Sequence, residues 1–151
     1  GRLDGSVFYR ALVLDREPKP NGLIQAGPRG ARDRVLPPIA HEPTTQTGLS
    51  HVNAAVSMAR MEPGSATGDF TIMLRDRTGL DANPASDDPN WRAGYAVFGH
   101  VVDGMEVVAA IHESGNDPDA GEGAMAGQMI AQPVMITKAR RVEAPSAPAT
   151  P

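Results

Sequence analysis

The sequence predicts a mostly β fold in a single domain, and three observations support this. Short apolar runs with β-branched or aromatic residues, or with rough alternation, recur at 6–14, 22–26, 54–60, 69–74, 95–102 and 133–142. The 16 glycines and 14 prolines fall between these runs, which is typical of short strands joined by loops. One segment, 103–115, has helical spacing instead. With 151 residues, 40% of them hydrophobic, we expect a barrel or sandwich with one core.

The first predicted strand, residues 6–14, carries a charge in its middle. Val7, Phe8 and Val13 suit a pleated, half-buried surface. Arg10 lies among them, and a guanidinium is costly to bury without a partner. Two explanations are open: Arg10 lies at a sheet edge with its head in solvent, or it takes part in the protein's chemistry.

The other elements follow from alternation and capping. Strand alternation is clearest at Val56 and Met58 and again in the last run. In the helical segment, Asp103 is placed as the N-cap with Glu106 three residues later, and the pattern ends at 114–115. Long loops are expected at 15–22, 27–48, 76–94 and 113–132, where binding sites on rigid scaffolds are common.

Composition excludes several classes of function. A net charge of −4 with 14 scattered basic residues argues against nucleic acid or an anionic membrane surface as a partner. The absence of cysteine excludes disulfides and thiolate metal sites, and no apolar stretch is long enough to span a membrane. The four histidines lack metal-ligand spacing, and neither Ser57 nor Ser65 lies in a Gly-x-Ser-x-Gly context. We therefore expect neither metal nor cofactor.

Four segments resemble the cyclophilin family of peptidyl-prolyl isomerases. They are "DGSVFYR" (4–10), "GLIQAGP" (22–28), "VSMARMEPGSATGDFTIML" (56–74) and "GYAVFGHVVDGMEVVAAI" (94–111). Family members show a strand ending Phe-His-Arg, then Met-Ile-Gln-Gly-Gly, then Ser-Met-Ala with Gly-Ser-Gln-Phe-Phe-Ile, then Val-Phe-Gly-x-Val-x-x-Gly-Met-x-Val-Val. The last block is the most specific, and the closing "QPVMITKARRV" is similar to the family's last strand, so the resemblance covers about residues 4–142.

The resemblance implies an antiparallel β-barrel with one or two capping helices. The family's first strands and first helix precede the Phe-His-Arg strand, so we expect them to be missing from residues 1–143, with 144–151 as a flexible Pro/Ala-rich tail. It also implies rotation about X-Pro bonds without a cofactor, and Pro-containing polypeptides as partners. Many bacterial relatives with "GEGAMAGQM"-like segments carry export signals, so a periplasmic location fits the resemblance and a cytoplasmic one stays open.

Site residues carry over position by position. Arg10 corresponds to the catalytic arginine, and Gln25 to the glutamine that helps hold that arginine and the substrate backbone. The residues expected to bind substrate are Leu23, Met58, Ala59, Arg60, Asp69, Phe70, Thr71, Trp91, Tyr95 and Phe98.

Several positions depart from the family pattern. Tyr9 replaces the histidine of Phe-His-Arg, Gly22 stands where the pocket has a phenylalanine, and Thr71 replaces a second pocket phenylalanine. Asp69 replaces a glutamine, and we expect it to pair with Arg10 and compete with substrate for its donors. Three alternatives follow: a slow isomerase, a module that binds Pro-containing peptides without useful catalysis, and a purely structural barrel.

Overall fold

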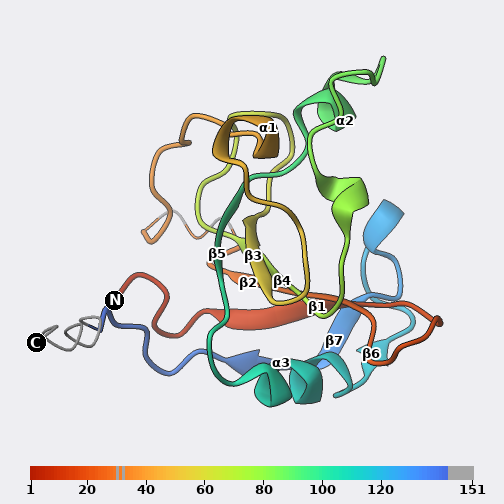
Figure 1. Cartoon of the computed structure of the whole chain (residues 1–151). Coiled ribbons are helices and arrows are strands. Elements are labelled where there is room, and N and C mark those ends of the chain that lie inside the picture. The colour runs from red at the N-terminus through yellow and green to blue at the C-terminus, as the bar shows by residue number, and fades with distance from the viewer. Residues whose placement is uncertain (30, 32, 143–151) are drawn as a thin grey trace, which may run out of the picture.

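The computed structural model describes residues 1–29, 31 and 33–142, and within them seven strands form one antiparallel sheet (Figure 1). The order across the sheet is β5-β3-β4-β2-β1-β7-β6. The strands are β1 (Val7–Val13), β2 (Gly22–Gly27), β3 (Ala55–Met58), β4 (Phe70–Met73), β5 (Val97–His100), β6 (Asn116–Asp117) and β7 (Met129–Met135). The predicted mostly β fold is confirmed, whereas the tail predicted at 144–151 lies outside the described residues.

The helices of the described part are short. They are α1 (Thr44–Thr47), α2 (Pro89–Ala93), α3 (Met105–His112) and two single 3₁₀ turns, η1 (Thr78–Leu80) and η2 (Gly123–Met125). The predicted N-cap of α3 at Asp103 is wrong: Gly104 occupies the cap with φ of 88°, and no side chain caps the helix. Glycine adopts this left-handed backbone at little cost, so the chain turns into α3 one residue later than predicted. None of the described helices combines the length and hydropathy needed to cross a membrane.

The last strand begins and ends earlier than the predicted range 133–142. It pairs with β1 at Phe8↔Val134 and Arg10↔Met129. Between these two pairs the chain advances by five residues in β7 but by only two in β1, so the ladder is irregular here. Pro133 lies in this irregular stretch, where it has no N–H to give to a regular ladder. Beyond β7, the backbone N–H of Ile136 still donates to the Ser6 carbonyl at 2.8 Å, but residues 136–142 belong to no strand.

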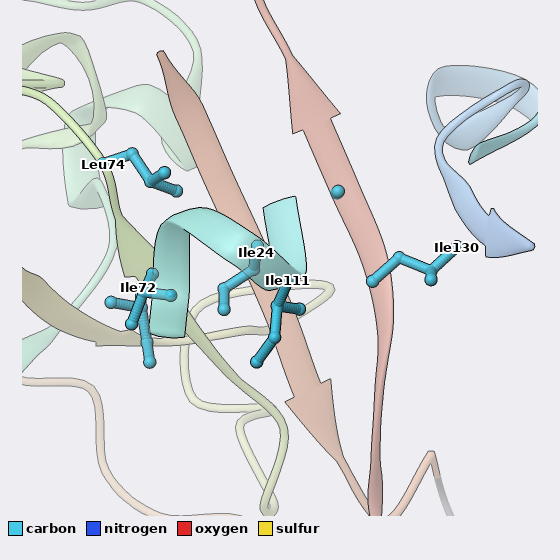
Figure 2. Packing of buried hydrophobic residues seen from close by; sticks show 7 residues of the cluster. Ile24, Ile72, Leu74, Ile111 and Ile130 are labelled. Atoms are coloured by element: carbon cyan, nitrogen blue, oxygen red, sulfur yellow. The ribbon is translucent and has the colours of Figure 1, made fainter. Parts of the chain in front are cut away.

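The core lies on both faces of β2. Ile24, with Ile72, Leu74, Ile111 and Ile130, belongs to a buried cluster that joins the sheet to α3 (Figure 2). Its neighbour along the strand points the other way, into a second cluster made of Leu23, Ala55, Met73 and Val97. All six residues of β2 are buried. The sheet is therefore covered by α3 on one face, and the opposite face carries the pocket described next.

Candidate active site

A β-bulge in β1 explains the charge in the middle of this strand. Phe8 pairs with Ala26 and Arg10 with Gln25, so Tyr9 is an extra residue without a partner in the β1–β2 ladder. A bulge bends the strand and turns a side chain from its regular direction. Here both Tyr9 and Arg10 reach the side chain of Gln25, which lies on β2.

Two glutamines hold the Arg10 guanidinium. Nη1 donates to Gln25 Oε1 at 2.8 Å, while Nε and Nη2 donate to Gln128 Oε1 at 2.9 and 2.7 Å. Both acceptors are neutral amides, so the positive charge is not cancelled. Burial lowers the pKa of Arg10, but an arginine starts so high that it stays protonated. Among the described contacts, three of the five N–H groups are used, leaving one on each Nη for a ligand.

Arg10 and Gln25 line a pocket of about 260 Å³ on the β3 and β4 side of β2. Its apolar wall contains Leu12, Leu23, Met58, Ala59, Leu80, Tyr95, Ala124 and Met125. Its polar wall contains Arg10, Gln25, Ser57, Arg60, Thr71 and Arg77. The cavity therefore combines an apolar wall with a fixed cationic donor at one side, a pattern found in small-ligand sites.

The structure brings eight of the twelve expected site residues to this pocket. They are Arg10, Gln25, Leu23, Met58, Ala59, Arg60, Thr71 and Tyr95. Arg60 is fixed there: its guanidinium lies 4.5 Å from the Tyr95 ring centroid and donates to the Gly94 carbonyl. Arg60 therefore forms part of the wall and is already occupied by protein acceptors.

Four expected residues lie outside the pocket lining. Trp91 on α2 is 46% exposed and Phe98 on β5 is 55% exposed, and neither lines the pocket. Phe70 packs toward the core, edge-on to Phe8 with ring centroids 6.2 Å apart. Asp69 is the fourth expected residue that does not line the pocket.

The expected ion pair between Asp69 and Arg10 is not formed among the described residues. Asp69 Oδ1 instead accepts the backbone N–H of Arg29 at 2.9 Å. Gly27 permits this approach, because a Cβ at position 27 would lie 1.9 Å from the same oxygen. The carboxylate is thus bound to the chain after β2 and leaves the Arg10 donors free of competition.

The buried side chain of His51 contacts Ser57, a residue that lines the pocket. His51 Nδ1 and Asp81 Oδ1 are 2.5 Å apart, and His51 Nε2 lies 2.9 Å from Ser57 Oγ. Ser57 lines the pocket but is only 1% exposed, and its hydroxyl also reaches the Ala96 carbonyl at 3.1 Å. Because the hydroxyl is buried and doubly bonded, this cluster fixes β3 against β5 and the η1 segment instead of supplying a nucleophile.

Acidification is expected to lower the free energy of unfolding through His51. Burial lowers the pKa of His51 below its usual 6.5, and the bond with Asp81 offsets only part of this. As the pH falls through about 6.5, His51 therefore takes up a proton in the unfolded chain but stays neutral in the folded chain. The contribution of His51 to the free energy of unfolding is complete above pH 6.5. It is lost as the pH falls through the lower pKa that His51 has in the folded chain.

Urea unfolding of the wild type and of His51→Gln between pH 7.5 and 5 measures this effect. The wild type should lose stability across this window, and the variant, already weaker at pH 7.5, should lose less. His100→Gln, at an exposed position, is the matched control and should keep the wild-type slope. Equal slopes in all three proteins would contradict the assignment to His51.

Sequence reasoning missed several pocket residues. Leu12 follows Arg10 by two residues on β1 and so faces the same side, a signal that alternation supplies. Gln128, Ala124 and Met125 come from the loop before β7, more than 110 residues from Arg10. No local pattern predicts that contact. Among the described residues, no three His, Asp or Glu side chains lie close enough to hold a metal ion.

Comparison with known proteins agrees with this geometry. A family model described as cyclophilin type peptidyl-prolyl cis-trans isomerase/CLD matches residues 1–141. The chain is 35% identical over 145 residues to peptidyl-prolyl cis-trans isomerase cyp18 of Streptomyces antibioticus, covering 93% of this chain and 77% of that protein.

Two further relatives are similar over a shorter part. A peptidyl-prolyl cis-trans isomerase of Acinetobacter baylyi is 34% identical over 112 residues, which are 72% of this chain and 52% of the relative. Peptidyl-prolyl cis-trans isomerase B of Escherichia coli is 34% identical over 116 residues, 74% of this chain and 63% of the relative. The family match over nearly all of the described residues decides the assignment: this chain belongs to the cyclophilin-type peptidyl-prolyl cis-trans isomerase family.

Proposed function

We propose that this chain accelerates rotation about X-Pro bonds in polypeptides, using Arg10 as the catalytic residue. The single observation that carries this proposal is the Arg10 guanidinium, held by Gln25 and Gln128 at the side of an apolar pocket with two N–H groups unused. Family membership supports the same reaction.

The reaction breaks no covalent bond. Rotation of an X-Pro amide meets a barrier of about 18–20 kcal/mol because the nitrogen is conjugated with the carbonyl. As the amide twists, this conjugation is lost and the nitrogen becomes pyramidal and basic. A site accelerates the rotation if it binds the twisted form more tightly than the planar one.

Arg10 has the right donors for this task. One free N–H holds the substrate carbonyl, and the second favours the nitrogen lone pair that appears only in the twisted amide. The apolar wall, including Leu23, Met58 and Leu80, receives the proline ring and excludes water. Exclusion of water strengthens the hydrogen bonds of Arg10.

The pocket is less aromatic than the family pattern, which affects binding more than chemistry. Thr71 lies on the wall and donates through Oγ1 to the Ser57 carbonyl at 3.3 Å. A threonine covers less of a proline ring than the phenylalanine of the family. We therefore propose an isomerase with weak binding of short peptides.

The Thr71→Phe variant tests this account of the pocket. We expect KM for a short Pro peptide to fall by about tenfold, the scale of burying part of one aromatic ring, while kcat changes little. Thr78→Phe, at an exposed position outside the pocket lining, is the matched control and should leave KM unchanged. A KM that stays constant in Thr71→Phe would show that the proline ring does not lie against β4.

A protease-coupled assay on a tetrapeptide with one X-Pro bond tests the proposed function. The isomerase proposal expects the cis-to-trans rate to rise with protein concentration and to return to the uncatalysed value in Arg10→Ala. Binding of the peptide with no rate increase would favour a binding module instead. No binding at all would favour a structural role.

A further inference from the structure

Gln128 makes more hydrogen bonds to Arg10 than any other described side chain. Its Oε1 accepts from both Nε and Nη2, at 2.9 and 2.7 Å, whereas Gln25 accepts from Nη1 alone. An acceptor shared by Nε and Nη2 lies along one edge of the planar guanidinium, and that contact fixes the plane as well as the position. Gln25 alone, bonded at one corner, leaves the guanidinium free to rotate about that bond.

The backbone and the amide group of Gln128 are both fixed. The backbone N–H of Ala11 donates to the Gln128 carbonyl at 2.9 Å, and Arg10 is paired with Met129, so Gln128 lies beside β1 at the bulge. The Gln128 Nε2 group donates to the Ala124 carbonyl at 2.7 Å. This bond selects one amide orientation, because the reverse orientation would turn an NH₂ group toward the donors of Arg10.

The orientation of Gln25 is fixed in a similar way. Its Nε2 donates to the Tyr9 hydroxyl at 2.6 Å, which leaves Oε1 facing Arg10. Burial raises the pKa of Tyr9 to about 12, so the phenol is neutral at physiological pH. Arg10 is therefore held from two sides by two neutral amides, each with its own orientation fixed by a further bond.

We propose that Gln128 is a positioning residue for the isomerase reaction: it sets the guanidinium plane of Arg10, and it does so through an uncharged oxygen that leaves the cation active. This inference rests on the proposed function. Through Gln128, the loop before β7 becomes part of the active site, together with Ala124 and Met125, which line the pocket.

The Gln128→Met variant removes both acceptor bonds and keeps the length of the side chain. We expect kcat to fall by about tenfold or more, the scale of losing hydrogen bonds to a charged group, with KM within about twofold because the pocket wall remains. In Gln128→Glu an acceptor oxygen returns for Nε and Nη2, but the carboxylate cannot donate to the Ala124 carbonyl and its charge pairs with Arg10. That variant should recover only part of kcat.

A spectroscopic measurement separates positioning from loss of fold. In the wild type the Arg10 Nε–H signal, identified by its absence in Arg10→Lys, should be protected from exchange with water; in Gln128→Met it should exchange faster, and in Gln128→Glu protection should return. Gln132→Met, an exposed position on the same strand, is the control and should match the wild type in both readouts.

The outcomes distinguish the two proposals. Wild-type kcat and an unchanged Arg10 Nε–H signal in Gln128→Met would overturn the positioning role. If the wild-type chain did not accelerate rotation at all, the proposed function would fail and the catalytic role of Gln128 with it, whatever the exchange of the Arg10 signal.

Discussion

Replacing Arg10 with alanine is expected to lower kcat/KM for an X-Pro peptide by about 10²–10³-fold, the effect of removing a fixed donor that stabilises a transition state. The reason is that both unused N–H groups belong to Arg10, which lines the pocket. No other described residue offers two donors held by neutral amides at this position. The coupled assay measures the loss directly.

Arg10→Lys is the matched variant. It keeps the positive charge but offers a single ammonium group instead of a planar fork, so we expect most of the loss to remain. Circular dichroism and thermal unfolding should show that both variants stay folded. Full activity in Arg10→Lys would mean that charge alone suffices and that the fork has no special role.

Replacing Gly22 with alanine is expected to destabilise the fold by about 3 kcal/mol or more, because the change cannot be absorbed locally. Gly22 has φ of 140°, and a Cβ at this position would lie 1.7 Å from the Leu12 carbonyl oxygen. That oxygen also accepts a bond from His112 Nε2 at 3.0 Å, so β1, β2 and α3 would all have to move. Urea unfolding measures the loss.

Gly99→Ala provides the control for this prediction. Gly99 also lies in a strand, but a Cβ built there meets nothing within 4 Å. We expect its effect to stay within about 0.5 kcal/mol. A similar loss in both variants would show that the cost comes from strand propensity and not from the contact with Leu12.

Gly22 also explains a gap in the pocket. The family pattern has a phenylalanine at this position, and its absence was expected to erode one wall. The backbone at Gly22 excludes any side chain, so this wall cannot be restored by changing residue 22 alone. Thr71, whose backbone is regular strand, is the position where an aromatic side chain can return.

The sequence was sufficient for the strands near the site, which local alternation predicts, and for the family and the contact of Arg10 with Gln25, which the resemblance of four blocks implies. It was not sufficient for the direction of Arg10, since a bulge at Tyr9 changes which face each side chain takes. The predicted ion pair between Asp69 and Arg10 is wrong, because the Asp69 carboxylate accepts the backbone N–H of Arg29 instead.

Contacts between residues far apart in the sequence could not be predicted either. Gln128 meets Arg10 because β7 pairs with β1 and begins at Met129, next to Gln128. The predicted loop at 113–132 extends past the start of β7, which begins at Met129. No local pattern shows which residue of a loop this long meets Arg10, so the contact of Gln128 with Arg10 could not be predicted.

The most direct test of the central claim is exchange NMR on a peptide with one X-Pro bond at equilibrium, with catalytic amounts of the chain added. This experiment measures rotation itself and needs no protease. We predict exchange cross-peaks between the cis and trans signals with the wild type and none above background with Arg10→Ala. Exchange of equal intensity with both proteins would contradict the assignment of catalysis to Arg10.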